Sequence, residues 1–322
     1  MANETLETAA TRLAALLGGS AATLSAPEGS DLDFEAVVEV RPLARTVAPA
    51  DVWAVDGGQA LVADARCLQL YVTRAATVRY QDGACVVEDE GELQATLLGG
   101  EAERAAAVGG LGVSAASSVD VNLLRDRAEW AAVERAVAAC DPGGFVLVDG
   151  DLQPDWRIPS SFLSALLEAA AARGVTLVGV TKHSSLARGG APLLGALERE
   201  AEALLGARST WWAPVARTRA DVGGVQVVAA SLDPDARFSF RIDLPAGADP
   251  EAALGALSAL CDDAAFPGYP YPLAVADGLA ACPGWLRSEV RLELDDLMAE
   301  AGIPEDVRER AFADRHRFLE RA

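Results

Sequence analysis

The sequence predicts an α/β fold in which a mixed β-sheet is flanked by helices. Residues 52–65, 67–80 and 83–90 are three closely connected runs of β-forming residues, which favours three consecutive antiparallel strands. Two short apolar runs, at 144–152 and 175–182, are separated by a helical stretch. A strand, a helix and a strand with short connections pair in parallel through a right-handed crossover. The sheet is therefore expected to combine an antiparallel meander with parallel strands.

Helices are predicted where apolar residues recur every three or four positions. The stretch 121–140 is the clearest case, and the turn-forming residues 141–144 end it. Its apolar stripe consists of Leu123, Trp130, Val133, Val137 and Cys140. A second helix runs from about Ser160 to Arg173, and the segment after residue 245 is mainly helical with a break at 282–284.

Further strands are expected outside this central part. Residues 34–43 favour one strand, and residues 225–245 favour a hairpin that turns at Asp233-Pro234-Asp235. We find no internal repeat, so the strands are expected to belong to one sheet-based domain rather than to a repeat array.

The chain is expected to divide into an N-terminal extension and one large domain. Residues 1–50 form the extension, in which an amphipathic helix over 3–17 offers a face for packing or dimerisation. Residues 51–322 form the main domain, with a variable surface insertion at about 86–120 and helices at its C-terminal end.

Composition indicates a globular protein of the cytoplasm. With 322 residues, of which 51% are hydrophobic, the chain can bury a large core. Its five cysteines are odd in number and scattered, so neither a disulfide framework nor a zinc site is indicated. The start lacks the basic region of a signal peptide, and no apolar run approaches the roughly 18 residues that span a bilayer. We therefore expect a cytoplasmic location and no membrane association.

The formal net charge is −21 at pH 7, which should repel nucleic acid at long range. A function on DNA would therefore require a local basic track or a basic partner protein. Four arginines are candidates for such a track: Arg125, Arg127, Arg157 and Arg188.

Two aspartates follow apolar runs in matching contexts, Asp56 in WAVDGG and Asp149 in VLVDGD. A carboxylate at the C-terminal end of a central strand lies where open α/β sheets bind ligands, and the following glycine lets the backbone turn away. Each Asp-Gly pair alone could equally begin an ordinary turn. Glu129, beside the buried helical stripe, is a third candidate, with Asp126 and Glu134 as alternatives.

The order of these acids resembles the ribonuclease H-like arrangement. An aspartate lies on the first strand of a meander, a glutamate on the next helix, and an aspartate on the next parallel strand. Such clusters hold two divalent cations roughly 3.5–4 Å apart, one activating water and one stabilising the leaving oxygen of a phosphodiester. Oxygen ligands suit Mg²⁺ or Mn²⁺. His183 and His316 are the only histidines, so a histidine-based hydrolase is poorly supplied.

Six motifs together resemble the NurA nucleases, which are partners of the HerA hexameric DNA translocase. The motifs cover most of the chain and are AVDGG (54–58), RDRAEW (125–130), LVDGDL (147–152), GVTKHSSL (179–186), FRIDLP (240–245) and GYPYPLAVAD (268–277). The resemblance implies that Asp56, Glu129 and Asp149 bind metal, with Asp277 at a fourth position where some relatives carry histidine. VDGD departs from the more usual Asp-Gly-Ser, so Asp151 is either an extra ligand or a polar turn residue.

The same resemblance implies a function. The family pattern is a manganese- or magnesium-dependent nuclease, acting 5′ to 3′ on single-stranded DNA and duplex ends during end resection in double-strand break repair. The resemblance further implies a homodimer that docks on a HerA-type hexameric ATPase.

Lys182 is the only lysine among 27 basic residues, which makes it a candidate for chemistry that arginine cannot supply. Its ammonium is a compact point charge, whereas a guanidinium is a wide planar fork. Lys182 ends the strand parallel to the one that carries Asp149, so it could reach the same sheet edge and hold a scissile phosphate or an attacking water. Drift at a tolerant surface position is the alternative.

Other substrate-binding candidates are Arg125, Arg188 and Tyr269. Tyr269 belongs to the loop AFPGYPYPL (265–273), whose aromatic rings could also stack on unpaired bases through Phe266 and Tyr271. Loops rich in proline and aromatic residues more commonly pack within the protein.

Two other function classes remain open at this stage. FVLVDGDLQ echoes the haloacid dehalogenase phosphatases, in which Asp149 would be the nucleophile and Asp151 the general acid, although Gln153 departs from that pattern. A non-catalytic adaptor that regulates a translocase is the second alternative. Dependence of phosphodiester cleavage on Asp56 and Asp149 separates both from a nuclease.

Overall fold

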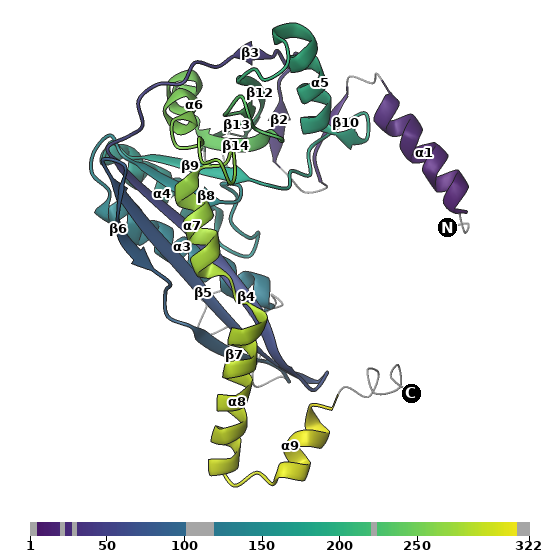
Figure 1. Ribbon diagram of the computed structural model, residues 1–322, viewed down its shortest axis with the longest axis vertical. Helices are drawn as coiled ribbons and strands as arrows, with labels where there is room; N and C mark the ends of the chain where they lie inside the picture. Colours follow the sequence, from purple (N-terminus) through teal and green to yellow (C-terminus); the bar gives the residue numbers. More distant parts are fainter. Residues whose placement is uncertain (1–4, 20–22, 28–30, 101–118, 220–223, 314–322) are drawn as a thin grey trace.

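The computed structural model describes residues 5–19, 23–27, 31–100, 119–219 and 224–313 (Figure 1). Its main feature is an 11-stranded mixed sheet. In sheet order, nine strands form one path: β2 (Leu32–Phe34), β12 (Trp211–Thr218), β13 (Val225–Ser231), β14 (Phe240–Pro245), β9 (Thr176–Thr181), β8 (Phe145–Asp149), β4 (Asp51–Asp64), β5 (Leu68–Gln81) and β6 (Ala84–Asp89). Off this path, β3 (Arg41–Pro42) pairs with β12, and β7 (Gln94–Gly99) pairs with β5.

The centre of the sheet has the predicted mixed pairing. Strands β4, β5 and β6 form an antiparallel meander, and β8 pairs in parallel with both β4 and β9. The meander turns tightly after β5 because Asp82 and Gly83 both have positive φ angles, of 48° and 80°, which suits the twist of a short hairpin. Strands β13 and β14 form the predicted antiparallel hairpin. The predicted mixed sheet, in which an antiparallel meander is joined to parallel strands, is thus confirmed.

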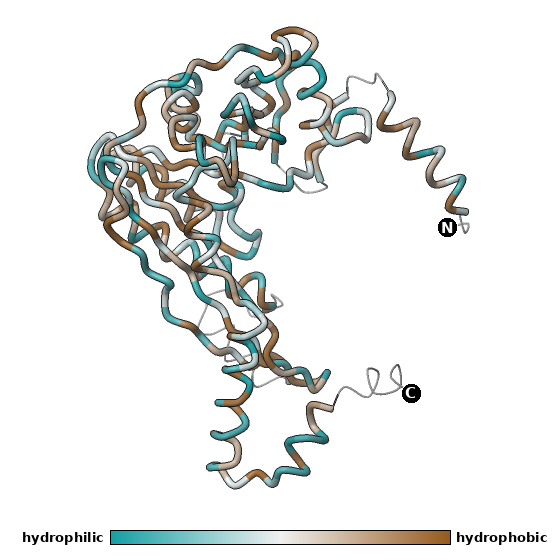
Figure 2. Tube along the Cα trace, viewed as in Figure 1, coloured by the Kyte–Doolittle hydropathy of each residue, from teal (hydrophilic) through white to brown (hydrophobic). Residues whose placement is uncertain are grey.

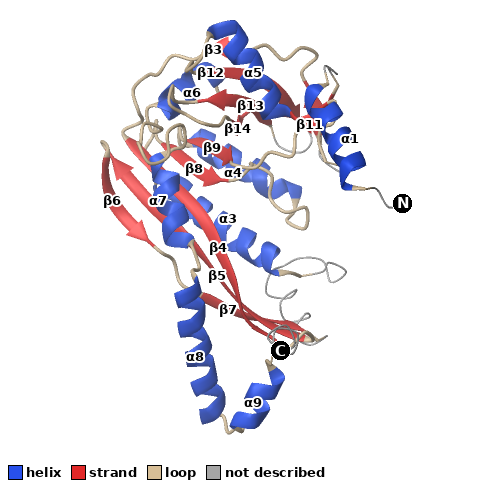
Figure 3. Cartoon of the chain, turned by 45° about the vertical axis from the view of Figure 1, so that its right-hand side comes forward, coloured by secondary structure: helices blue, strands red, loops and turns tan. Residues whose placement is uncertain are grey.

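Helices cover both faces of this sheet (Figure 3). Helices α3 (Val121–Ala139) and α4 (Ser160–Ala172) lie on one face, and α6 (Pro250–Ser258) and α7 (Tyr271–Ala280) lie on the other. Local signals place their starts: Asp120 accepts the N–H of Leu123 at the start of α3, and Asp249 caps α6. The helices predicted over 121–140 and 160–173 are confirmed, as is the break before residue 284.

Alternation along the central strands separates two hydrophobic cores. On β8, Phe145 and Leu147 belong to the core beneath α6 and α7, whereas Val146 and Val148 belong to the core beneath α3 and α4. The whole predicted stripe of the 121–140 helix is buried in the second of these cores. This alternation decides which side chains can meet near each helix.

Peripheral elements extend this body at both ends. Helix α1 (Leu6–Gly18), predicted over 3–17, projects from one end, while α8 (Gly284–Glu300) and α9 (Glu305–Ala311) project from the other (Figure 1). None of these three helices has a buried residue, and Figure 2 shows hydrophobic and hydrophilic positions intermixed along them. A small sheet near α1 consists of β1 (Leu24–Ser25), β10 (Ala187–Arg188) and β11 (Ala191–Pro192), followed by α5 (Leu193–Leu205).

Two regions differ from the sequence prediction. The single strand expected over 34–43 is wrong: only the two ends of this range pair, Phe34 as the last residue of β2 and Arg41–Pro42 as β3, each with a different part of β12. Pro214 lies between those two parts and coincides with an irregularity in register, because proline lacks the N–H that a ladder requires. Within the expected insertion at 86–120, residues 94–99 form β7. Residues 101–118 lie outside the described residues.

No helix in the described ranges combines the length and apolar character that crossing a bilayer requires.

Candidate active site

Strand alternation brings Asp56 and Asp149 to the sheet face that α7 covers. On β8, Leu147 lies in the core beneath α6 and α7, and Asp149 follows two residues later on the same face. On β4, Ala54 lies in that same core, and Asp56 follows two residues later. The parallel register of β4 and β8 also places the two aspartates level with each other. Two acids far apart in the sequence therefore meet because their strands share a face and a register.

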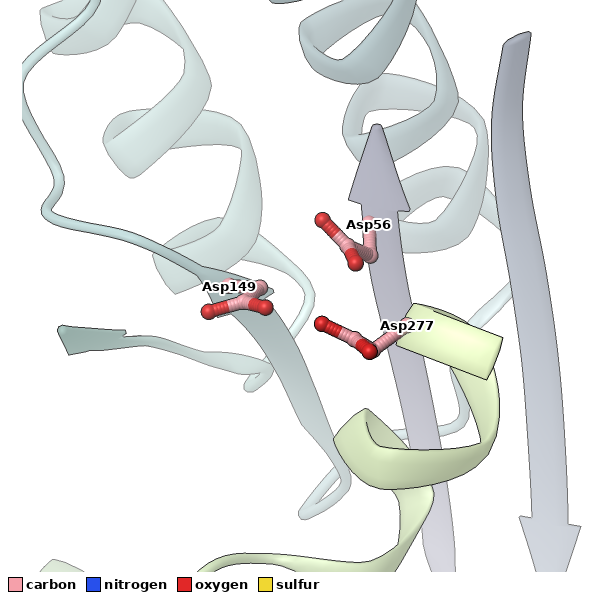
Figure 4. A group of neighbouring side chains, drawn as sticks. All are labelled: Asp56, Asp149 and Asp277. Atoms are coloured by element: carbon pink, nitrogen blue, oxygen red, sulfur yellow. The ribbon is translucent and has the colours of Figure 1, made fainter. Parts of the chain in front are cut away.

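Asp277 completes a cluster of three carboxylates, here called the carboxylate cluster. Figure 4 shows Asp56 from β4, Asp149 from the end of β8 and Asp277 from α7 converging on one space. Each offers one oxygen, and these oxygens lie within 4.8 Å of one another. Asp56 is only 8% exposed, whereas the side chain of Asp277 is 53% exposed. The cluster is therefore buried at its base and open to solvent beside α7.

The two glycines after Asp56 allow helices to approach β4 from both faces. A Cβ atom on Gly57 would lie 2.7 Å from Oε2 of Glu129 on α3, and one on Gly58 would collide with the carbonyl of Ala280 at the end of α7. We predicted from the sequence that Asp56 ends its strand and that the glycine turns the chain away. That prediction is wrong, because β4 continues well beyond Asp56. The glycines provide room for neighbours rather than a turn.

Arg74 fixes the C-terminal end of α7, a role that no sequence pattern indicates. Its side chain is 9% exposed and donates from Nε to the carbonyl of Ala280 at 3.2 Å and from Nη2 to the carbonyl of Ala281. Carbonyls at a helix C-terminus lack partners within the helix, and a cation there is favourable. Arg74 lies on β5, opposite Gly58 of β4, and thereby holds the helix that carries Asp277 against the strand next to the one that carries Asp56.

Lys182 lies between two members of the cluster. Its Nζ is 2.6 Å from Oδ2 of Asp149 and 2.5 Å from Oδ1 of Asp277. It also lies 5.1 Å from the centre of the Tyr269 ring, within the range of a cation–π contact. Burial opposes the charge on Lys182, but the hydrogen bonds to Asp149 and Asp277 outweigh it and raise the pKa of Lys182. The lone lysine is therefore a charged part of the site.

The acids of the cluster hold more negative charge than Lys182 balances. Burial, and next the charge of Asp149, raises the pKa of Asp56 to about 7, against a hydrogen bond from the N–H of Gly57. Burial also raises the pKa of Asp149, although Lys182 opposes that change. Like charges held together in a partly buried cleft shift in this way, and such groups are typical of functional sites.

Glu129 approaches Asp56 from the opposite, α3 side of β4. It is 6% exposed, and burial followed by the charge of Asp56 raises the pKa of Glu129 well above its ordinary value. Its carboxylate is not part of the group whose oxygens lie within 4.8 Å. The alternatives on α3 have other surroundings: Asp126 accepts the N–H of Asp155 at 2.9 Å, and Glu134 is exposed. Glu129 is thus the acid of this helix that lies beside the cluster.

The predicted substrate-binding residues divide into two groups. Arg125 Nε and Tyr269 Oη are buried atoms without a hydrogen-bond partner in the described part of the chain, and both residues lie beside acids of the site. Burial and the charge of Asp149 raise the pKa of Tyr269. Arg188, in contrast, lies on β10 and pairs with Glu200 of α5, so its charge is used within the small-sheet region.

Two further candidates from the sequence are engaged in structural contacts. Arg157 pairs with Asp120 at 3.0 Å and with Asp155 at 2.6 Å. The ring of Tyr271 packs edge-on against Tyr80, with 5.0 Å between ring centres.

Asp151 points to a separate ion-pair network rather than to the cluster. Arg241 Nη1 lies 3.1 Å from Asp151, and its Nε and Nη2 donate to the two oxygens of Asp243 at 2.8 Å each. Asp243 also accepts the N–H of Leu152 at 3.1 Å. The network holds the turn that directly follows Asp149, which gives the FRIDLP motif a positioning role that periodicity alone does not reveal.

The donor set fits a hard divalent cation. Three carboxylates converge, their negative charge exceeds the positive charge beside them, and carboxylate oxygens are the ligands that Mg²⁺ and Mn²⁺ prefer. Among the described residues, one buried polar atom at the end of β9, Thr181 Oγ1, also lacks a partner. Unpartnered buried groups are uncommon in proteins unless a ligand or water satisfies them.

Comparison with known proteins identifies structural but not sequence similarity. The chain is similar to the NurA nuclease from Sulfolobus solfataricus at 16% identity, with 83% of this chain and 89% of that chain covered and a TM-score of 0.56. A second NurA structure covers 74% of this chain and 86% of that chain at 7% identity and a TM-score of 0.47. The structure of human ENDOV matches over 76% of this chain and 86% of that chain, at 15% identity and a TM-score of 0.40. Neither a protein-family model nor a curated protein sequence matches the chain significantly.

The first of these similarities covers most of both chains. At 16% identity it speaks for architecture rather than for individual residues. The resemblance to NurA that the six motifs indicate is therefore confirmed at the level of the fold, and this chain has the fold of a NurA nuclease.

Proposed function

We propose that this protein is a divalent-metal-dependent deoxyribonuclease that hydrolyses phosphodiester bonds. The observation that carries the proposal is the carboxylate cluster: three acids from separate elements converge at one partly open face of the sheet, with a lone lysine between them. The similarity of the fold to a NurA nuclease supports the same reaction class.

The residues divide the work of the reaction. Asp56, Asp149 and Asp277 would hold the metal through carboxylate oxygens. Bound Mn²⁺ or Mg²⁺ would supply a water of lowered pKa and offset charge on the phosphodiester. Arg74, through α7, and the Arg241 network, through the turn after β8, keep these carboxylates in position.

Lys182 and Glu129 would act at the edges of this site. When metal binds the carboxylates, the ammonium of Lys182 becomes free to contact a phosphate oxygen, a role for which a compact charge is suited. Glu129 lies next to Asp56 across β4 and is the candidate for a second cation, as two-metal hydrolysis of phosphodiesters requires. Arg125 and Tyr269 are placed to assist because each has a buried polar atom without a partner in the described ranges.

The biological setting that we propose is DNA end processing with a hexameric HerA-type ATPase, with single-stranded DNA and duplex ends as substrates. The net charge of −21 supports the need for such a partner, because an acidic protein captures DNA poorly unless DNA is delivered to it. The extension of residues 1–50, with the exposed helix α1, is our candidate for a homodimer contact.

Two measurements on purified protein test the proposal. Labelled single-stranded DNA should be cleaved with Mn²⁺ and not with EDTA, and Asp149→Asn should lower the rate by at least about a hundredfold, more than an outer-shell partner typically contributes. Mn²⁺ should also stabilise the wild type against urea, by about 2.7 kcal/mol at a concentration one hundred times the Kd, and should stabilise Asp149→Asn less.

Asp296→Asn, an exposed aspartate on α8, is the matched control and should retain both properties. Equal cleavage by wild type and Asp149→Asn would show that a contaminant or another site is responsible, and the proposal would then fail. Cleavage only in the presence of a translocase would support delivery of DNA by a partner. Absence of cleavage in both conditions would favour the non-catalytic adaptor.

The phosphatase alternative gains no support from the geometry. It requires Asp151 to act as a general acid beside Asp149, but the Asp151 carboxylate pairs with Arg241. Burial raises the pKa of Asp151 to about 6, even though Arg241 opposes that change. Hydrolysis of a small phosphate ester without any cleavage of DNA would be the result that restores it.

A further inference from the structure

A cavity of about 500 Å³ opens directly beside the carboxylate cluster. Three of its lining residues, Lys182, Tyr269 and Asp277, belong to the site already described. Its other walls come from two loops, the turn between β13 and β14 and the loop before α7. We call this cavity the aromatic pocket; its remaining lining includes Asp235, Arg237 and Phe238 from the turn, Phe240 at the start of β14, and Phe266 and Pro267 from the loop.

The aromatic pocket presents unusual side chains to solvent. Phe238 is 61% exposed and Phe266 is 59% exposed, although each is large and apolar. Single exposed apolar residues are normal on protein surfaces, but here both line one concave space with a polar rim. Concave sites of about 300–1,000 Å³ with mainly apolar walls and a few polar groups are typical of small-molecule and cofactor binding.

The two loops that form the pocket are fixed to each other. Gly268 has a φ of 90°, and a Cβ atom there would lie 2.5 Å from Cβ of Ala236 in the opposite loop. The N–H of Gly268 donates to the carbonyl of Cys261 at 2.8 Å. The rings of Phe240 and Tyr269 pack together, with 5.5 Å between their centres. The walls therefore exist before any ligand binds.

A charged group is available at the rim. The guanidinium carbon of Arg237 lies 5.3 Å from the centre of the Phe238 ring. Asp235 at the same rim pairs with Arg208, and Arg237 forms no ion pair with any residue in the described ranges. Arg237 can therefore contact an anionic ligand without first losing a partner.

We propose that the aromatic pocket binds one unpaired nucleobase of the substrate strand, immediately next to the phosphate that is cleaved. Phe238 and Phe266 would stack on the base, and Arg237 would contact the neighbouring phosphate. The occupant follows from continuity: a strand whose phosphate lies at Lys182 and Asp277 has its adjacent nucleoside within reach of a cavity lined by those same two residues. This inference rests on the proposed nuclease function and deepens it.

The consequence is a structural reason for preferring unpaired DNA. A base that enters the pocket cannot remain paired in a duplex, so cleavage requires a single strand or an end that frays. Stacking on a ring tolerates any base, because every base has a π-face. The pocket thus selects for the unpaired state and not for sequence.

The first test compares intact and abasic oligonucleotides with the double variant F238A/F266A. For the wild type, one abasic nucleotide next to the cleaved bond should raise KM about tenfold, and the double variant should raise KM for intact DNA by a similar factor, with kcat nearly unchanged. The two losses should not add when combined. Trp285→Ala, which removes an exposed ring on α8 outside the pocket, is the matched control and should leave KM unchanged.

A second measurement does not depend on cleavage. Single-stranded DNA carrying 2-aminopurine, with Ca²⁺ in place of Mn²⁺, should lose fluorescence on binding to the wild type and not on binding to F238A/F266A, with thermal melting confirming that both are folded. Equal quenching by both proteins, or additive KM losses, would overturn the pocket assignment while leaving the nuclease proposal intact. If quenching depends on the rings of Phe238 and Phe266 but the protein never cleaves DNA, the pocket assignment would stand and the nuclease proposal would fail.

Discussion

Asp51 and Asp56 are both buried on β4, five positions apart, yet their surroundings are opposite. Asp51 is 4% exposed and accepts hydrogen bonds from Arg79 Nε at 2.8 Å, Arg79 Nη2 at 3.2 Å and the N–H of Asp141 at 2.8 Å. Burial opposes its charge, but these bonds outweigh burial and lower the pKa of Asp51. Within the described ranges, Asp56 accepts a hydrogen bond only from the N–H of Gly57, and its pKa is raised to about 7.

We attribute the difference to a structural role for Asp51 and, under the proposed function, a metal-binding role for Asp56. The fold supplies Asp51 with donors that lower its pKa, so its ionised form contributes to the stability of the native state. Around Asp56 the fold places other carboxylates. The positive charge beside them, that of Lys182, is too small to balance their negative charge. An arrangement that costs stability in the absence of a ligand is expected where a cation binds during function.

The largest expected effect is on catalysis at Asp56. Asp56→Asn removes one ligand oxygen charge, and the rate of DNA cleavage should fall about a thousandfold, equivalent to about 4 kcal/mol of activation free energy. In EDTA, urea unfolding should show unchanged or higher stability, because the substitution removes repulsion from Asp149. A large loss of stability in EDTA would contradict the distinction drawn between the two aspartates.

At Asp51 the expectation is reversed. Asp51→Asn leaves Arg79 without its buried partner charge, and the free energy of unfolding should fall by about 3 kcal/mol. Under conditions in which the variant remains folded, most of the cleavage rate should be preserved, because Asp51 lies at the start of β4, five residues before Asp56, and is not part of the carboxylate cluster. Urea unfolding and single-turnover kinetics measure the two quantities, and a hundredfold loss of rate in folded protein would refute the assignment.

The pH dependence of stability follows from the same ion pair. The pKa of Asp51 in the folded state lies below its ordinary value of 3.8, so its charge stabilises the native state above about pH 4. That contribution is lost as the pH falls through the folded-state pKa. Wild-type protein should therefore lose stability more steeply below pH 4 than Asp51→Asn, as urea midpoints over pH 2.5–6 would reveal.

Much of the fold, and the nearness of Asp56, Asp149 and Glu129 to one another, could be predicted because their signals are local. Apolar runs precede Asp56 and Asp149, and an apolar stripe lies beside Glu129. These patterns directly indicate which residues are buried and whether the segment is a strand or a helix. Strand alternation then places Asp149 and Lys182 on one face, since Val180 and Leu147 lie in the same core. The two-residue period of a strand therefore predicts which side chains lie on the same face of the sheet.

The rest depends on contacts that have no local signature. Nothing near Arg74 in the sequence distinguishes it from other arginines, although it holds the end of α7. The role of Gly58 depends on a helix more than two hundred residues later in the chain. Arg188 was placed near the site by its position after Lys182, but the small sheet carries it to Glu200. Nearness in the sequence to a strand end is thus a weaker guide to the position of a side chain than the alternation of side chains between the two faces of a strand.

Gly58 offers a smaller, steric test of how the cluster is held. Gly58→Ala would drive a methyl group into the carbonyl of Ala280, so α7 must shift, at a cost of about 2 kcal/mol of stability. The shift also moves Asp277, and Mn²⁺ should stabilise the variant less than the wild type. Gly278→Ala on the same helix meets nothing within 4 Å and should leave stability equal or slightly higher. Equal effects of the two substitutions would mean that the approach of α7 to β4 is not constrained.

Lys182→Arg is the smallest and most specific change, because it preserves charge. The ammonium fits between Asp149 and Asp277 at 2.6 and 2.5 Å, and a guanidinium in that space must either spread over both acids or withdraw. We expect about a tenfold lower kcat, equivalent to about 1.4 kcal/mol, with little change in urea stability. Arg237→Lys, a change of the opposite kind at the rim, should alter KM rather than kcat. Normal kcat in Lys182→Arg would remove the support for a special role of the lone lysine, and its survival among arginines would then reflect chance.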